Sequence, residues 1–313
     1  MTNIQWTEQV WNPTTGCDRV SDGCLNCYAL TMAKRLKGMG SAKYQTDGDP
    51  RTSGPGFGFA MHADTIREPL RWKKPRKVFV NSMSDLFHAG NPDANLHLIF
   101  GVMAATPQHT YQILTKRHGR MRSLLNNPQF AHMVRHRAEA VYGRAPEAGW
   151  TWPLPNVHLG VSVENQQWAD IRIPALLGTP AVVRFLSCEP MVGPVDLGGV
   201  LRSDLYRCAC GAWEWDGDKH PLCADCGRSW TWKPGASAID WVIIGGESGP
   251  GARPFHPDWA AALIKDSRAA GAAPFVKQLG SVWARENNAS DAKGGKPADW
   301  PEDLRVREYP ASP

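Results

Sequence analysis

The 313-residue sequence lacks long apolar runs, and no segment approaches the roughly 18 apolar residues of a membrane-spanning helix. The opening MTNIQWTEQVWNP has neither the basic nor the apolar segment of a secretory signal peptide. Neither sign of charge dominates, since the net charge is +5, which permits a nucleic-acid partner without requiring one. We therefore expect a soluble, cytoplasmic, globular protein with no membrane partner.

Cysteine is plentiful, with eight residues that fall mainly into two clusters. In a reducing compartment, clustered thiols bind metal more often than they form disulfides. In the second cluster, two close pairs of cysteines flank twelve residues, which predicts a zinc-ribbon-like knuckle with structural Zn²⁺. Free thiols or a rubredoxin-like iron site are the alternatives. The four predicted ligands are Cys208, Cys210, Cys223 and Cys226, and the same insertion presents Trp213 and Trp215.

The first cluster, GCDRVSDGCLNCYA at residues 16–29, holds Cys17, Cys24 and Cys27. Three thiols are one short of a closed zinc site. Cys188 is the one cysteine left unassigned. It precedes Glu189 at a predicted strand end, so it could lie near the barrel mouth, and it is equally well explained as a buried small hydrophobic residue. The pattern favours a [4Fe–4S] cluster whose fourth iron has no protein ligand. A zinc site completed by a fourth residue, or thiols without a metal, remain alternatives.

Short apolar runs alternate with helical patterns along the chain, which predicts parallel βαβ units. The fold class is therefore α/β, a full or partial parallel (βα) barrel of about six to seven units, with a doubly wound sheet as the alternative. We predict the first part of the barrel at 1–201, the zinc-knuckle insertion at 202–236, and the last strands with a C-terminal tail at 237–313. The tail from about residue 286 is polar and Gly/Pro-rich, and we expect it to be peripheral.

Polar residues end five of the predicted strands. In a parallel barrel the carboxyl ends of the strands form the active-site face, so these residues are expected to converge there with the first cysteine loop. They are Ser84–Asp85, Lys116–Arg117, Glu164–Asn165, Glu189 and Glu247–Ser248.

The three-cysteine loop, which ends in CxxCY, resembles the radical S-adenosylmethionine (radical SAM) superfamily, although the first cysteine interval has six residues where three is commonest. Eight phrases are similar to a phage-associated, uncharacterised family that carries the same motif and is grouped with those proteins. They are WNPTTGC, GCLNCYA, VFVNSMSDLFH, ILTKR, LGVSVEN, FLSCEPMVGPV, WVIIGGESGPGARP and FVKQLG. The GCxxCY ending alone is also similar to spore photoproduct lyase. The resemblance places a phage-encoded copy in the host cytoplasm.

The resemblance implies that Cys17, Cys24 and Cys27 hold three irons, while the fourth binds S-adenosylmethionine. Reduction by an electron donor would then cleave this molecule to methionine and a 5′-deoxyadenosyl radical. Tyr28 is expected to shield the cluster or adenine, or simply to pack at the helix start. The other implied cofactor contacts are Ser82, Ser84, Asp85, Lys116, Glu164, Gly245, Gly246 and Glu247, and the implied substrate contacts are Arg117, Glu189, Arg253 and Lys277.

Basic residues gather just before the second predicted strand, in REPLRWKKPRKVF, with Trp72 among them. Cations interleaved with aromatic rings suit a phosphate backbone and stacked bases. The first hypothesis is therefore a radical SAM enzyme that modifies or repairs DNA or RNA or acts on a nucleotide. The alternatives are the same enzyme on a peptide or small metabolite, and a non-catalytic metal-binding scaffold that binds nucleic acid.

Overall fold

The computed structural model describes residues 4–143, 150–198, 205–207, 213–215, 231–232 and 238–311. Two compact units divide the chain, Met1–His158 and Leu159–Pro313. The cysteine loop lies in the first unit, and three of the polar strand ends belong to the second.

The main sheet has seven strands among the described residues, in the order β1-β4-β5-β6-β7-β11-β12. The pairs β1–β4, β4–β5, β7–β11 and β11–β12 are parallel. Because this order follows the chain without a reversal, it has no switch point of the doubly wound kind. The fold is α/β and consistent with the predicted partial (βα) barrel. Continuous burial along β6 (Val157–Ser162) and β7 (Val183–Cys188) agrees with strands covered on both faces.

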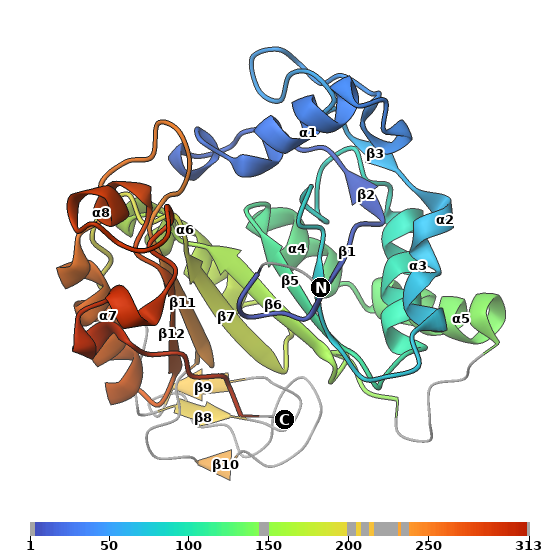
Figure 1. Cartoon of the computed structure of the whole chain (residues 1–313). Helices are drawn as coiled ribbons and strands as arrows, with labels where there is room; N and C mark the ends of the chain where they lie inside the picture. Colours follow the sequence, from blue (N-terminus) through green and yellow to red (C-terminus); the bar gives the residue numbers. More distant parts are fainter. Residues whose placement is uncertain are drawn as a thin grey trace. The chain divides into compact units, whose positions relative to one another are not determined.

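In the first unit, helix α3 packs against α5 (Figure 1). Gly101 of α3 permits this, because a Cβ there would lie 2.8 Å from Cβ of Arg137. Asn127 caps α5 by accepting a hydrogen bond from the Gln129 N–H. The elements of this unit are β1 (Gln9–Trp11), β2 (Thr14–Thr15), η1 (Asp22–Cys24), α1 (Tyr28–Gly38), η2 (Ala42–Tyr44), β3 (Ala60–Met61), α2 (Ala63–Ile66), η3 (Glu68–Arg71), β4 (Lys77–Val80), α3 (Asp93–Ala104), β5 (Thr110–Thr115), α4 (His118–Leu125) and α5 (Pro128–Tyr142).

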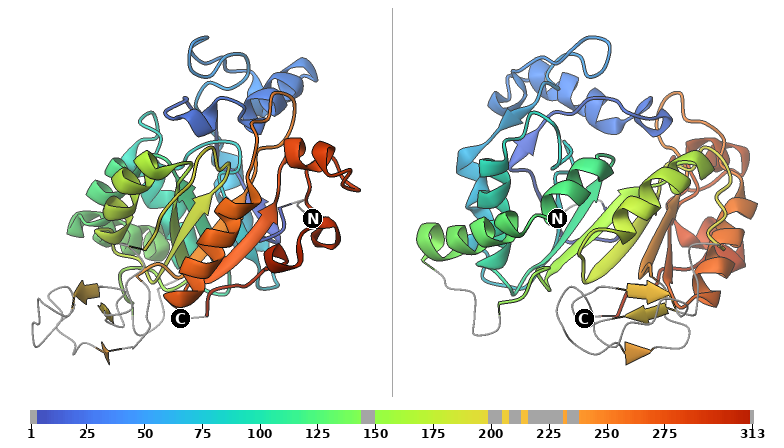
Figure 2. Two further views of the ribbon diagram at one scale, coloured as in Figure 1. Left: turned by 90° about the vertical axis from the view of Figure 1, so that its left-hand side faces the viewer. Right: turned by 180° about the vertical axis from the view of Figure 1, so that it is seen from behind.

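In the second unit, helix α7 packs against the apolar strands β11 and β12 (Figure 2). Trp241 of β11 is fully buried and meets Phe275 of β12 edge to face. The elements of this unit are α6 (Gln166–Leu177), β7, β8 (Leu205–Arg207), β9 (Trp213–Trp215), β10 (Thr231–Trp232), β11 (Trp241–Gly245), α7 (Pro257–Ala269), β12 (Ala273–Gln278), α8 (Ser281–Glu286), η5 (Pro297–Asp299) and η6 (Glu302–Leu304).

The expectation of a peripheral tail is wrong. Trp300 is buried and donates its indole N–H to the carbonyl of Gly294. Arg307 pairs with Phe275 in an isolated bridge and lies over the Trp300 ring. The Val276 N–H donates to the Val306 carbonyl, and Arg307 donates to the carbonyls of Val276 and Lys277, so these hydrogen bonds hold the polar, Gly/Pro-rich segment against β12.

Strands β8, β9 and β10 fall inside the predicted insertion and form an antiparallel sheet of their own in the order β10-β8-β9. The four predicted zinc ligands of this segment lie outside the described residues, so structural Zn²⁺ stays a prediction. Within the parts of the chain that are described, no helix is both long and apolar enough to cross a bilayer.

Candidate metal centre

The first cysteine loop lies between β2 and α1. Gly16, directly before Cys17, has a φ of +85°, and a Cβ there would lie 2.1 Å from the Gly58 carbonyl oxygen. Only glycine suits a residue with this conformation and this close approach. The Gly16 N–H also donates to the Met83 carbonyl, 3.0 Å away, which ties the start of the loop to the segment after β4.

The three cysteines of the loop are free thiols; Cys17 and Cys27 pack against the same small core, and the Cys27 N–H donates to the Cys24 carbonyl at 3.3 Å. Burial raises the pKa of Cys17 to about 12, with a further increase from the Asp85 carboxylate. Burial also raises the pKa of Cys27. The charge of Cys24 adds to the increase in pKa at both Cys17 and Cys27.

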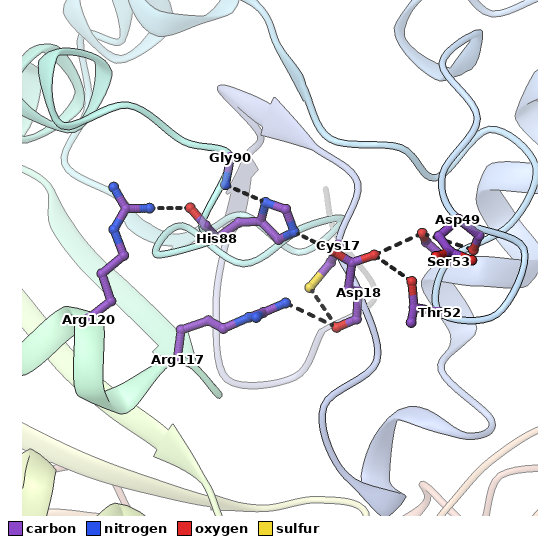
Figure 3. Close-up of polar contacts among 9 residues, drawn as sticks. All are labelled: Cys17, Asp18, Asp49, Thr52, Ser53, His88, Gly90, Arg117 and Arg120. Carbon is purple, nitrogen blue, oxygen red and sulfur yellow. Dashed lines mark hydrogen bonds and ion pairs between the residues drawn. The ribbon is translucent and has the colours of Figure 1, made fainter.

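An aspartate–histidine pair fixes the residue that follows Cys17 (Figure 3). His88 Nε2 lies 2.8 Å from Asp18 Oδ2, and the Gly90 N–H donates to His88 Nδ1 at 3.1 Å. Because Nδ1 accepts, the ring proton is assigned to Nε2, which donates to the carboxylate. Asp18 also accepts hydrogen bonds from the Thr52 and Ser53 hydroxyls. Burial raises the pKa of Asp18, but these hydrogen bonds lower it more.

Sequence reasoning missed this pair. Asp18 stands inside the cysteine motif, and His88 closes the phrase VFVNSMSDLFH, yet the pattern does not reveal that residues 70 positions apart meet. Phe59 stacks on the His88 ring with centroids 4.9 Å apart, and Arg120 donates to the His88 carbonyl. Contacts to both the ring and the backbone carbonyl therefore fix the position of His88.

The predicted residues after β4 contact the flanks of the cysteine loop. The Ser84 hydroxyl bonds the Thr14 carbonyl at 3.0 Å, and the Ser82 hydroxyl donates to Asn12 Oδ1 at 3.3 Å. Tyr28 is 56% exposed, and its hydroxyl donates to the Ser82 carbonyl at 2.6 Å. The ring therefore packs little at the helix start, and its hydroxyl ties α1 to the β4 end.

Asp85 is buried at the end of β4 and accepts three hydrogen bonds. The donors are the Thr115 hydroxyl at 2.7 Å, the Lys116 N–H at 2.9 Å and the Phe87 N–H at 3.0 Å. The carboxylate thus joins the ends of β4 and β5 next to Cys17.

Lys116 and Arg117 place two cations beside the thiols. Arg117 lowers the pKa of Cys17 both by its charge and by a hydrogen bond, and Lys116 lowers that of Cys27 by its charge. Arg117 also reaches the Asp18 carbonyl at 3.4 Å (Figure 3). Consecutive residues at the end of β5 therefore approach two different cysteines of the loop.

In the second unit, Glu164 is fully buried and bound to Arg172 at 2.7 Å. Arg172 in turn lies over the Trp168 ring, 4.0 Å from its centroid. Cys188 is also fully buried, and burial, followed by the charge of Glu164, raises its pKa to about 12. The arrangement supports the small-hydrophobic interpretation of Cys188 and gives Glu164 a protein partner.

The other predicted residues of this unit also form ion pairs. Lys277 pairs with Glu189 at 2.5 Å, and Arg253 pairs with Glu247 at 2.7 Å. A Cβ on Gly246 would lie 2.4 Å from the Leu279 carbonyl oxygen, and one on Gly245 would lie 3.3 Å from the Glu189 side chain. These glycines therefore admit close approach by the protein itself.

The donor set fits an iron–sulfur cluster. Cluster irons are held by cysteine thiolates, and each thiolate ligates a different iron, so the sulfurs do not need to meet at one point. Three free thiols on one short loop, two of them packed against the same small core, can supply three such ligands. Among the described residues, no group of three or more His, Cys, Asp or Glu side chains is gathered as for a single metal ion.

Comparison with known proteins gives a family but no activity. No curated protein and no solved structure matches the chain. The family described as "Protein of unknown function (DUF5131)" matches residues 1–302, nearly the whole sequence. The chain therefore belongs to the DUF5131 family, whose function is unknown.

Proposed function

We propose that the protein is a radical SAM enzyme in which Cys17, Cys24 and Cys27 hold a [4Fe–4S] cluster, and that it acts on a nucleic acid or a nucleotide. The carrying observation is the presence of three free thiols on the β2–α1 connection, two of which, Cys17 and Cys27, pack against the same small core. When bound, the cluster supplies one-electron reductive cleavage of S-adenosylmethionine to methionine and an adenosyl radical.

The chain's own residues hold and prepare this loop. Gly16 lets the chain turn into Cys17, and the His88–Asp18 hydrogen bond fixes the backbone after it. Because burial keeps Cys17 and Cys27 protonated, binding of iron must release their protons. The positive charges of Arg117 and Lys116 favour that release.

The same two cations support a site for the carboxylate of S-adenosylmethionine. An Arg guanidinium can grip a carboxylate through two parallel hydrogen bonds, and a Lys ammonium adds a point charge. Ser82 and Ser84 hold the neighbouring loop through hydrogen bonds, so their proposed contact with the amine uses the lone pairs and backbone groups that remain. Contacts of substrate with Glu189, Arg253 and Lys277 stay proposals.

The nucleic-acid substrate is supported by exposed cations. Arg67, Arg71, Lys73, Lys74 and Lys77 are all exposed between α2 and β4. The Trp72 ring is half-buried against His109, and Arg76 lies 5.9 Å from its centroid, so this ring is engaged by the protein. The patch therefore supports phosphate contacts more than base stacking.

Anaerobic reconstitution of the full chain tests the proposal. We expect about four iron and four sulfide per first cysteine site and formation of 5′-deoxyadenosine with dithionite and S-adenosylmethionine. Zinc alone in that site, with no cleavage, would refute the enzyme and favour a metal-binding scaffold.

A mobility-shift assay across salt concentrations tests the substrate class. We expect Lys73→Ala/Lys74→Ala to weaken DNA or RNA binding and to lower its salt dependence, because binding with fewer phosphate contacts releases fewer counterions. Lys265→Ala, at an exposed position on α7, is the matched control. Unchanged binding in the double variant would favour the peptide or small-metabolite alternative.

A further inference from the structure

An exposed apolar stripe begins on the cysteine loop and continues along α1. Leu25, Tyr28, Met32 and Met39 are 54%, 56%, 41% and 68% exposed. Together with the exposed Arg35, they follow one another at intervals of three and four residues. That spacing places Tyr28, Met32 and Arg35 on one face of α1, with Leu25 in the loop before the helix and Met39 at its C-terminal end.

The opposite face of α1 already has its partners. Ala29 and Ala33 are buried in a small core with Tyr44, Phe57 and Met83. Cys17 and Cys27 pack against this core. Tyr28 also donates its hydroxyl to the Ser82 carbonyl, while Leu25, Met32 and Met39 remain largely exposed outside this core. Clustered exposed apolar side chains of this kind mark interaction sites.

The stripe starts within the candidate metal centre itself. Leu25 stands between Cys24 and Cys27, and Tyr28 directly follows Cys27. A protein that covers these side chains lies within a few residues of two cluster ligands. The rate of electron transfer between proteins falls steeply with distance. A redox partner that binds at this stripe would therefore have a short path to the cluster.

The charge of the helix indicates the kind of partner. α1 carries Lys34, Arg35 and Lys37 and no acidic residue. Lys37 is paired with Asp47. Arg35 is exposed within the stripe, and Lys34, the residue before it, is exposed as well. Apolar side chains with a basic rim complement an acidic surface. Redox encounters are also among the smallest protein interfaces, below about 1,200 Å² in total, which suits a stripe of one short helix.

We propose that the stripe Leu25–Tyr28–Met32–Arg35–Met39 is the docking surface for an acidic one-electron carrier protein. The inference rests on the proposed function, because a cluster must be present to accept the electron. A reduced flavin protein would lose one electron and become its semiquinone, and the [4Fe–4S]²⁺ cluster would gain that electron and become [4Fe–4S]⁺. No bond forms or breaks, and no proton is transferred.

The test compares two reductants on the reconstituted full chain. Photoreduced, purified acidic flavodoxin needs to dock, whereas dithionite does not. The variants Met32→Glu and Arg35→Glu place negative charge on the stripe. Ile171→Glu and Lys265→Glu are the matched controls, at exposed positions of α6 and α7. Iron content and the rate of cluster reduction by each reductant are measured at low and high salt.

We expect both stripe variants to slow reduction by flavodoxin about tenfold at low salt, with a smaller difference at high salt. Iron content and reduction by dithionite should equal those of the unmodified chain, and the controls should behave like it. Equal flavodoxin rates in the stripe variants and the unmodified chain would overturn the docking surface. So would slower reduction by both reductants, which would indicate damage to the cluster site.

Two further outcomes would also overturn it. If the stripe variants abolish a dimer in light scattering, or DNA binding in a shift assay, while flavodoxin rates stay equal, the stripe binds a second copy or nucleic acid. If the unmodified chain takes up no iron, or dithionite does not reduce it, the proposed function itself fails. If dithionite reduces the unmodified chain normally and flavodoxin reduces the stripe variants normally, only the proposed docking surface is refuted.

Discussion

The His88 imidazole donates to the Asp18 carboxylate, 2.8 Å away, across 70 residues of sequence. Asp18 directly follows Cys17, so this bond connects the first cysteine of the candidate cluster to the segment after β4. The Gly90 N–H holds the other ring nitrogen, and Phe59 stacks on the ring. The pair positions the loop without itself being a metal ligand in the proposed site.

His88→Ala should lower the free energy of unfolding by about 1–3 kcal/mol, because it removes a hydrogen bond to a charged group. It should also lower the iron content after reconstitution, since the backbone at Cys17 loses its anchor. Chemical denaturation and iron analysis measure the two effects. His136→Ala, at an exposed position of α5, is the control. Full iron content in His88→Ala would contradict a positioning role.

Asp85→Asn should lower the pKa of Cys17, because a nearby carboxylate disfavours the thiolate. Arg117→Ala should raise it, because the guanidinium favours the thiolate. In the metal-free chain, alkylation of Cys17 by iodoacetamide at about pH 8 to 10 should therefore be faster in the first variant and slower in the second. Peptide mass spectrometry measures the rates. The same direction of change in both variants would be incompatible with this electrostatic account.

Glu164→Ala should lower the free energy of unfolding by about 3–5 kcal/mol, because it leaves the buried Arg172 guanidinium without its carboxylate. Glu302→Ala, at an exposed position, should change it little. Thermal and urea unfolding provide the comparison. A Glu164→Ala chain of normal stability that binds S-adenosylmethionine weakly would instead support the cofactor contact that the resemblance implies for Glu164.

Cys188 should resist thiol reagents in the folded chain, because burial both excludes the reagent and raises its pKa to about 12. Mass spectrometry after labelling, with and without denaturant, measures this protection. Cys188→Ala should also retain the full iron content of the first site. Loss of iron in this variant would make Cys188 a ligand and reopen the four-ligand interpretation.

The sequence predicted the sheet well, because strands buried on both faces give continuous apolar runs such as WVIIG at β11. Lys116 directly follows β5 as expected, whereas Asp85, expected at a strand end, lies five residues after the end of β4; both affect the pKa of a cysteine in the loop. The sequence did not distinguish a strand-end carboxylate that is open to a ligand from one already neutralised, as Glu164 is by Arg172. The difference depends on a contact between a strand end and the next helix, which no local pattern encodes.

The same limit applies to the tail and to the loop anchor. Trp300 sits in a polar, Gly/Pro-rich context that predicts an exposed segment, yet the ring is buried. His88 and Asp18 are unremarkable in sequence and become informative only when folding brings them together. The burial of Trp300 and the Asp18–His88 hydrogen bond depend on contacts made in the folded chain rather than on the residue types alone.

Reductive cleavage of S-adenosylmethionine by the anaerobically reconstituted chain tests the central claim most directly. With dithionite, the unmodified chain and Cys188→Ala should both form 5′-deoxyadenosine, and Cys24→Ala should form none, because it lacks one of the three proposed cluster ligands. Equal product from Cys24→Ala and the unmodified chain, or no product and only zinc in the unmodified chain, would contradict the account.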